Sequence, residues 1–319
     1  MTDHAATPRL VTFGETMGLF AASKAGKFGV ERAFGLGIGG AESNVAIGAA
    51  RLGTSVTWFG RVGSDSTGQH IVDLLTAEGI ETIAIGDPGF TGLMVKHERF
   101  AGSTVVDYHR AGSAGSRLAP GDIPRERLQQ ARVLHLTGIT PALSDSARRT
   151  TFEAIEVAKD AGVLVSLDIN YRRKLWQPDE AGPVLKELVG LSDIVFAGRD
   201  ESDLVTGHRS AGAQEALRHL ADLGGPEVII KDGARGCSAV IDDVALHQDA
   251  VCVQVVDPVG AGDAFVAGYL SERVRDADPE LRLRVAVQAG GLAVATPGDC
   301  ENLPYRSDLE RINGTDVTR

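Results

Sequence analysis

The sequence has few cysteines and no cysteine motif. Its 319 residues include only Cys237, Cys252 and Cys300, and no two of them have the CxxC spacing. Three cysteines cannot all pair with one another, so neither a zinc site nor a disulfide framework is indicated. This cysteine usage is typical of a protein from a reducing compartment.

Positive charge is also scarce. Lysine and arginine total 32 against 43 aspartates and glutamates, which gives a formal net charge of -11. This balance argues against a general nucleic-acid or anionic-membrane binder, so any anion site has to be local. No apolar run approaches the length of a membrane span, and the stretch MTDHAATPRL lacks the apolar core of a secretion signal. We therefore expect a cytoplasmic protein that binds neither nucleic acid nor membrane.

Motifs of several common enzyme classes are absent. The chain contains no GxxxxGK[ST], HExxH or GxSxG pattern, which disfavours a P-loop kinase, a zinc protease and a typical serine hydrolase. A GxGxxG does occur at Gly35, Gly37 and Gly40. No clear strand precedes it, and the run Ser55–Phe59 ends without the acidic residue of a dinucleotide site. A dehydrogenase is therefore disfavoured, and it would require binding of NAD.

Apolar residues are plentiful, at 43% of the chain, and suffice for a folded core. Short β-rich runs alternate with segments of helical periodicity, which predicts a parallel sheet with helices on both faces. The expected strands are Leu10–Phe13, Ser55–Phe59, Val133–Leu136, Val163–Leu167, Ile194–Ala197 and Val228–Lys231. The clearest expected helices are Ile71–Glu78, Ala147–Lys159 and Ala213–Leu223. Asp168, Asn170 and Lys231 fall at the carboxyl ends of strands, where ligands bind in such sheets.

Two extended segments do not fit this alternation. Thr91–Phe100 and Thr104–Arg110 indicate a hairpin, and a glycine-bearing stretch extends over about residues 14–40. We predict a single domain over residues 8–314, with a β lid formed by segments of about 14–40 and 91–111. Projecting lid strands leave open edges, so we also expect a homo-oligomer, a dimer or larger, assembled through the lid.

The segment DPVGAGDAFVAG, residues 257–268, carries the strongest chemical signal. It lies between the apolar run Val251–Val256, an expected strand, and the expected helix Ala264–Leu270. A glycine turn at a helix N-terminus exposes unpaired N–H groups that suit a phosphate, and Asp263 in the first helical turn can act as a base toward a hydroxyl. The alternative is a plain turn in which Asp263 caps the helix.

A second glycine cluster precedes the expected helix Ser43–Leu52. Gly39 and Gly40 permit close backbone approach to a ligand, and Asn44 offers a donor and an acceptor to a polyol. The alternative role for Asn44 is helix capping. A phosphate-binding turn with its own acid, together with a polyol site, indicates phosphoryl transfer to a hydroxyl.

Three motifs in this order resemble the ribokinase-like, or PfkB-type, carbohydrate kinases: GGAESNVAIGAARLG, GRVGSDSTG at Gly60 to Gly68, and DPVGAGDAFVAG. The likeness extends from about Leu10 to Arg306. It implies a ribokinase-like α/β fold, a three-layer αβα sandwich with a mostly parallel central sheet and a small β-sheet lid. It further implies ATP and Mg²⁺ as cofactors, Asp263 as catalytic base, and an anion hole formed by the amides of Gly260, Ala261 and Gly262. Residues expected along the nucleotide site are Lys231, Gly233, Ala234 and Gly236.

Internal segments narrow the likeness to the 2-keto-3-deoxygluconate kinases: FTGLMV, DYHRAGSAGSRLAP, LHLTGITPAL, SLDINYRRKLW and PGDCENLPYR. A sugar-acid substrate is chemically coherent, because an arginine offers a planar two-pronged donor to a carboxylate. The likeness implies that the sugar acid contacts Gly40, Tyr108, Arg110, Arg172, Asp263 and Asp299, and that Asn170 lies between substrate and phosphates.

The chain departs from the family pattern at three places. The usual Asn-x-x-Glu is here Gly198, Arg199, Asp200, Glu201, which keeps only Glu201 as a candidate magnesium ligand. Met94 replaces a tyrosine of the lid, and His109 stands where another aromatic residue is common. One hydroxyl contact to the substrate is thereby lost, so preference can shift to an epimeric sugar acid. A fructose or ribose kinase of the same family and a non-catalytic sugar or nucleotide sensor stay open as alternatives.

Overall fold

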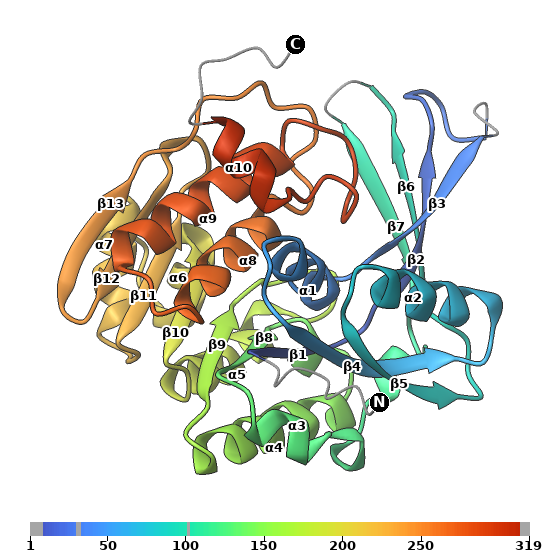
Figure 1. Ribbon diagram of the computed structural model, residues 1–319, viewed down its shortest axis with the longest axis horizontal. Helices are drawn as coiled ribbons and strands as arrows, with labels where there is room; N and C mark the ends of the chain where they lie inside the picture. Colours follow the sequence, from blue (N-terminus) through green and yellow to red (C-terminus); the bar gives the residue numbers. More distant parts are fainter. Residues whose placement is uncertain (1–8, 30–32, 101–102, 313–319) are drawn as a thin grey trace, which may run out of the picture.

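A nine-stranded sheet forms the centre of the molecule (Figure 1). The computed structural model describes residues 9–29, 33–100 and 103–312. Across the sheet the strands follow the order β13 (Val244–Gln248), β12 (Cys237–Ile241), β11 (Glu227–Lys231), β10 (Ile194–Gly198), β9 (Leu164–Asp168), β8 (Val133–Thr137), β1 (Leu10–Phe13), β4 (Val56–Gly63) and β5 (Glu81–Asp87). Neighbours from β11 to β5 are parallel, whereas β12 and β13 are antiparallel additions at one edge. The mostly parallel sheet expected from the sequence is confirmed.

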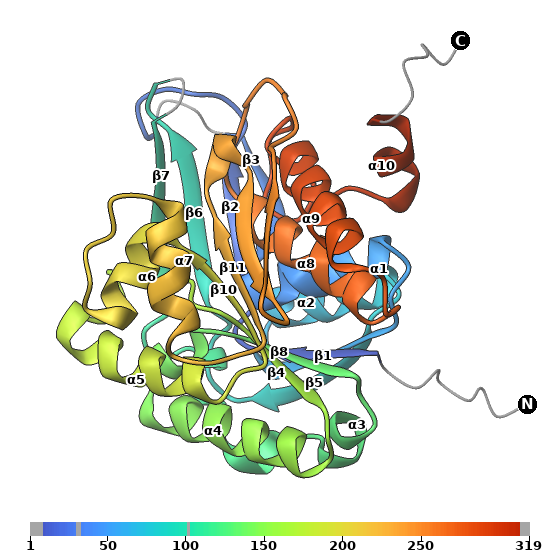
Figure 2. The same cartoon turned by 90° about the vertical axis from the view of Figure 1, so that its left-hand side faces the viewer.

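Helices cover both faces of the sheet (Figures 1 and 2). Because side chains alternate along a strand, Leu10 packs into one core and its neighbour Val11 into the other. The first core includes α1 (Ala41–Arg51), α2 (Ser66–Ala77), α8 (Ala261–Arg273) and α9 (Pro279–Ala293). The second includes α3 (Arg125–Gln129), α4 (Asp145–Asp160), α5 (Pro178–Gly190), α6 (Arg199–Thr206) and α7 (Ala213–Ala221). The three-layer sandwich is thus confirmed. In the part of the chain described here, no helix combines the length and the apolar character needed to cross a bilayer.

A separate four-stranded sheet forms the lid. Its order is β3 (Phe34–Gly39), β2 (Met17–Ala22), β6 (Leu93–Glu98) and β7 (Thr104–His109). The pairs β2–β3 and β6–β7 are antiparallel, and the central pair β2–β6 is parallel. In Figure 1 the lid rises above α2 and beside α1, and β2 contacts α2. The small lid sheet is therefore confirmed, while the limits 8–314 of a single domain stay a prediction.

The strand expected over Val251–Val256 is wrong. The structure assigns no strand there, and Val255 and Val256 are 63% and 47% exposed. The N–H groups of Val256 and Asp257 donate to the carbonyl of Val294, just past the end of α9, at 2.7 and 3.2 Å. The backbone of this segment hydrogen-bonds to the end of a helix and not to a strand. The apolar run therefore connects β13 to α8 without joining the sheet.

Candidate active site

Two adjoining cavities lie between the lid and the carboxyl ends of the main strands. The larger, of about 1020 Å³, is named the lid cavity, because β2, β6 and β7 contribute to its wall. The smaller, of about 500 Å³, is named the strand-end cavity, because residues at the ends of β9, β10 and β11 line it. Gly260, Asp263 and Asp299 line both. A group at this border can act on a molecule in either cavity.

The start of α8 forms one side of the border. Gly260 is the N-cap residue and has the left-handed φ of +77°, which favours glycine. A Cβ at this position would lie 2.7 Å from the carbonyl oxygen of Asp299, so the two loops meet here without room for a side chain. Within the described ranges no side chain caps α8, and a helix leaves its first N–H groups without intrahelical acceptors. These amides and the positive end of the helix dipole suit an anion in the strand-end cavity.

Asn44 joins the two carboxylates at the border. Its Nδ2 donates to Asp263 Oδ2 at 2.8 Å and to Asp299 Oδ1 at 2.7 Å. Asn44 Oδ1 is buried and has no hydrogen-bond partner among the described residues. The N-cap of α1 is Gly40, so Asn44 does not cap that helix. The amide nitrogen of Asn44 is thus fully used within the protein, whereas its amide oxygen is available to accept a hydrogen bond from a ligand.

Burial controls the ionisation of both carboxyl groups. It raises the pKa of Asp263 to about 7, an effect that the Asn44 hydrogen bond opposes and the charge of Asp299 reinforces. Burial likewise raises the pKa of Asp299 to about 6, against the Asn44 hydrogen bond and the nearby Lys96. A carboxylate with a pKa near neutrality is well matched to general base work at physiological pH.

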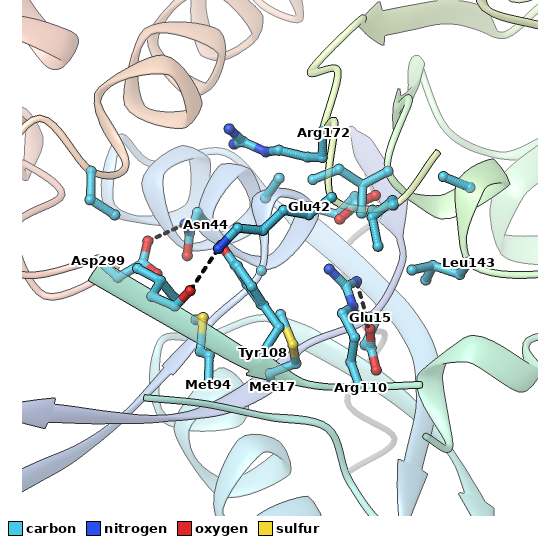
Figure 3. A pocket seen from close by; sticks show the side chains of 18 of the residues that line it. Glu15, Met17, Glu42, Asn44, Met94, Tyr108, Arg110, Leu143, Arg172 and Asp299 are labelled. Atoms are coloured by element: carbon cyan, nitrogen blue, oxygen red, sulfur yellow. Dashed lines mark hydrogen bonds and ion pairs between the residues drawn. The ribbon is translucent and has the colours of Figure 1, made fainter. Parts of the chain in front are cut away.

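The two arginines expected to meet a carboxylate differ in their surroundings. Arg110 is held by the buried Glu15, whose Oε2 accepts from Arg110 Nε at 2.7 Å and from Nη2 at 2.6 Å. Arg172 lies across the lid cavity, lines both cavities, and its guanidinium has no hydrogen bond or ion pair within the described ranges (Figure 3). Of these two arginines, Arg172 is therefore the one whose guanidinium is available to an incoming anion.

Charged groups also meet where β9, β10 and β11 end. Lys231 Nζ lies 2.7 Å from both carboxylate oxygens of Asp168. Burial acts to lower the pKa of Lys231, but Asp168 and Glu201 outweigh it and raise that pKa, so the ammonium stays charged. Asn170 follows β9 in the left-handed region, with φ of +39°. The strand-end cavity thus holds a fixed cation beside the start of α8.

The carboxylate of Glu201 serves the backbone around this cavity. It accepts from the N–H of Gly198 at 2.7 Å and from the N–H of Tyr171 at 2.8 Å. Among the described residues no cluster of three or more histidines, cysteines, aspartates or glutamates could hold a metal ion. Mg²⁺ commonly uses one or two carboxylates and completes its shell with water and substrate phosphates. The donor set therefore fits a magnesium ion that arrives with a polyphosphate, and does not fit a metal held by protein alone.

The structure brings most of the expected site residues together. The lid cavity is lined by Gly40, Asn44, Met94, Tyr108, Arg110, Arg172, Asp263 and Asp299. The strand-end cavity is lined by Asn170, Glu201, Lys231, Gly260 and Gly262. Ala261 is the first residue of α8. Gly233, Ala234 and Gly236 lie at the 3-10 turn that follows β11 and line neither cavity.

Gly39 and Gly40 prove to be required by the protein itself. A Cβ on Gly39 would lie 2.0 Å from Met94 Cε and 2.4 Å from Asp299 Oδ2. A Cβ on Gly40 would lie 2.6 Å from the carbonyl oxygen of Glu15. The sequence predicts that the backbone of these two glycines comes close to a ligand. In the structure it comes close to Met94, Asp299 and the carbonyl of Glu15, which brings the end of β3 next to Asp299.

Two buried glutamates of the site were not expected from the sequence. Glu15 follows β1, and its carboxylate holds both Arg110 and the hydroxyl of Ser113. Glu42 lies in α1, accepts from Thr137 Oγ1 and Thr140 Oγ1 at 2.7 Å each, and has its pKa raised by burial. For Glu15 a signal was present, because it follows the expected strand Leu10–Phe13 at the edge where ligands bind. Glu42, in a helix that is buried along most of its length, gave none.

Comparisons with known proteins identify a family of kinases and relatives that are similar in sequence and fold. The family model described as pfkB family carbohydrate kinase matches residues 7–306. A 2-dehydro-3-deoxygluconokinase of Bacillus subtilis (strain 168) is 36% identical over 305 residues, which cover 94% of this chain and 93% of that protein. A 2-dehydro-3-deoxygluconokinase of Thermoproteus tenax is 34% identical over 282 residues, covering 86% and 85%. The crystal structure of 2-dehydro-3-deoxygluconokinase from Thermotoga maritima superposes with a TM-score of 0.88 at 25% identity, covering 97% of this chain and 98% of that one.

Proposed function

The chain belongs to the pfkB family of carbohydrate kinases, and from this premise we propose that it transfers the γ-phosphoryl group of ATP to the 6-hydroxyl of 2-keto-3-deoxy-D-gluconate (2-dehydro-3-deoxygluconate). One observation carries the proposal. Asp263 lies where the lid cavity meets the strand-end cavity, beside the free amides at the start of α8. A sugar in the first cavity and a triphosphate in the second would present their reacting atoms to the same carboxylate.

The chemistry follows from this placement. Asp263 accepts the proton of the sugar hydroxyl as its oxygen attacks the γ-phosphorus, and the bond from that phosphorus to the β–γ bridging oxygen breaks, which releases ADP. The amides of Gly260, Ala261 and Gly262 stabilise the negative charge on the transferred group. Mg²⁺, when bound with the nucleotide, neutralises phosphate charge, and Glu201 is the carboxylate placed to hold it, directly or through water.

The sugar acid fits the polar groups of the lid cavity. We assign its carboxylate to Arg172, whose guanidinium has no partner among the described residues, with Arg110 as a second, already neutralised contact. Its hydroxyls meet Asp299, Tyr108 and the free acceptor of Asn44. Gly40 and Met94 complete the wall. Met94 carries no hydroxyl, so this position contributes packing where a tyrosine would donate a hydrogen bond.

ATP is assigned to the strand-end cavity. Lys231 and Asn170 face the cavity and suit the phosphates, since an ammonium and an amide both donate hydrogen bonds to phosphate oxygens. The remainder of the nucleotide would extend past the end of β11 toward Gly233, Ala234 and Gly236. A sugar and ATP are the expected small-molecule partners.

A panel of sugars in a coupled ADP-release assay tests the proposal. The panel contains 2-keto-3-deoxy-D-gluconate, its galacto epimer, fructose and ribose. We expect the highest kcat/KM for 2-keto-3-deoxy-D-gluconate, because the unpaired Arg172 can bind its carboxylate, a group that neutral sugars lack. The highest value for fructose or ribose would reassign the substrate within the family, and a preference for the epimer would support an altered contact at Met94. Binding of ATP without turnover of any sugar would indicate a sensor.

A further inference from the structure

Lys96 is a deeply placed cation of the lid, and its partners belong to the main body. Lys96 lies on β6 and is only 8% exposed. Its Nζ lies 2.5 Å from Asp257 Oδ2 and 3.3 Å from the carbonyl oxygen of Gly298. Lys96 lines the strand-end cavity and does not line the lid cavity. The ammonium therefore sits on the proposed phosphate side of the site.

Each partner of Lys96 lies in a loop that carries part of the proposed machinery. Asp257 lies in the loop that leads to Gly260, and its Oδ1 accepts from the N–H of Val259 at 3.1 Å. Its Oδ2 also accepts from the N–H of Gly298 at 3.4 Å. Gly298 directly precedes Asp299. One ammonium thus fastens the loop of the α8 amides and the loop of Asp299 to a single lid strand.

We propose that Lys96 is a positioning residue: by pairing with Asp257 it holds the loop of the α8 amides and the loop of Asp299 in register with the lid. The inference rests on the function proposed above. A buried charge is costly unless it is paired, so any displacement of β6 from the main body would separate Lys96 and Asp257 from their oppositely charged partners. The lid position that covers the sugar is consequently the position in which the phosphate-binding amides are aligned.

The first experiment needs no substrate. Hydrogen exchange followed by mass spectrometry is measured on the ligand-free protein for wild type, Lys96→Met and the matched control Lys24→Met. Lys24 is an exposed lysine of the same lid, in the turn after β2. In peptides covering residues 257–263, we expect the hydrogen-bonded amides of Asp257 and Val259 to exchange at least about tenfold faster in Lys96→Met, the effect of losing one charge-assisted hydrogen bond, and to be unchanged in Lys24→Met. Unchanged exchange of these peptides in Lys96→Met would overturn the proposal.

The second experiment measures steady-state kinetics with the best sugar of the panel. In Lys96→Met we expect kcat to fall by about tenfold or more with KM for the sugar nearly unchanged, because the ammonium aligns the phosphate side, and Lys96→Arg should recover part of the loss. The double variant Lys96→Met/Asp257→Asn should lose no more than the worse single variant, since both changes break one pair. Losses that multiply, or an effect confined to KM for the sugar, would contradict the proposal.

The two experiments separate this inference from the proposed function. If wild type phosphorylates no sugar, the proposed function fails, and the exchange measurement still decides whether Lys96 orders residues 257–263. If Lys96→Met does not fold, the double variant carries both measurements, because it leaves no unpaired buried carboxylate. In that variant, fast exchange of residues 257–263 supports the link and wild-type exchange contradicts it.

Discussion

At the scale of single residues, the amide of Asn44 is the centre of the site. It bridges Asp263 and Asp299, so the ionisation of the proposed base depends on its neighbour. The two side-chain partners of Asn44 lie 219 and 255 positions away in the sequence, so no local pattern indicates these contacts. The properties of Asp263 are therefore set by contacts that only the folded chain creates.

The activity should fall on the acid side of neutrality. Only the deprotonated Asp263 can accept a proton, and its pKa is raised to about 7, so kcat/KM should decrease as the pH drops below that value. In Asp299→Asn a negative charge that raises the pKa of Asp263 is removed, so the acid limb should move to lower pH even though substrate binding weakens. Profiles of kcat/KM for both proteins check this. An acid limb that stays in place in the variant would contradict the coupling.

Replacement of Asp263 tests its role directly. Asp263→Asn keeps the shape of the side chain and removes the base, so kcat should fall by about 10² to 10⁴ while binding of ATP is nearly unchanged. Turnover in the coupled assay and nucleotide titration by calorimetry measure the two effects. Retention of roughly a tenth or more of wild-type turnover would exclude Asp263 as the base, because this threshold is well above the turnover expected after loss of a general base.

The two arginines should respond differently to removal. Arg172→Ala should raise KM for the sugar acid and reduce its advantage over neutral sugars by about tenfold or more, since a charge-assisted contact contributes about 1.5–3 kcal/mol. Arg110→Ala should also raise KM, and in addition it leaves the buried Glu15 unpaired, which should lower the free energy of unfolding by about 3–5 kcal/mol. Kinetics and thermal unfolding of both variants check this. Equal melting temperatures for the two variants would contradict the assigned difference.

The sequence supports the identity of site residues better than their partners. Asp263, Asn170 and Lys231 can be placed because the end of a parallel strand or the start of a helix marks a site. The pairing of Arg110 with Glu15 and of Lys96 with Asp257 cannot, because each joins residues 95 and 161 positions apart through the lid. Such contacts depend on how two sheets are oriented, which local patterns do not encode.

At the scale of elements, the start of α8 explains why its two glycines are not equivalent. Gly260 needs the left-handed φ and has no room for a Cβ, whereas a Cβ on Gly262 would lie 3.6 Å from Lys231 Nζ, an ordinary contact. One glycine is required by the fold. The other keeps the cavity wall free of a side chain.

Alanine at each position should separate these roles. Gly260→Ala should lower both the melting temperature and kcat, because the left-handed backbone costs about 1–2 kcal/mol and the methyl group pushes on the Asp299 loop. Gly262→Ala should keep the melting temperature and raise KM for ATP, because its methyl group enters the strand-end cavity. Thermal unfolding and nucleotide kinetics check both. A Gly262→Ala protein with wild-type KM for ATP would contradict the assignment of phosphates to this cavity.

The elements themselves were well predicted where periodicity is strong. All six expected strands of the main sheet and the helices between them are present, with ends shifted by a few residues. The error at Val251–Val256 has a simple cause, because an apolar run does not reveal whether a strand partner is available. Here the N–H groups of Val256 and Asp257 donate to the carbonyl of Val294 after α9 in place of a neighbouring strand.

At the scale of the whole molecule, the lid leaves apolar side chains of an edge strand exposed. Phe34 and Leu36 are exposed on the edge strand β3, at 36% and 51%. We propose that the protein forms a dimer or larger assembly through this lid, since exposed edges and apolar patches commonly mark an interface. The substitution Leu36→Lys should then shift the mass measured by light scattering toward the monomer, while Val244→Lys, on the main-sheet edge strand β13, should not. A wild-type protein that is monomeric at all concentrations would exclude the proposal.

The parallel pairing of β2 with β6 has a consequence for biosynthesis. Between these strands the chain makes β3, α1, β4, α2 and β5, so β2 and β3 leave the ribosome long before β6 exists. During that interval the early hairpin exposes one unpaired edge together with Met17 and Leu19, which are buried in the finished lid. Exposed strand edges and apolar side chains favour aggregation, so a pause in translation before residue 93 should increase aggregation of the nascent chain.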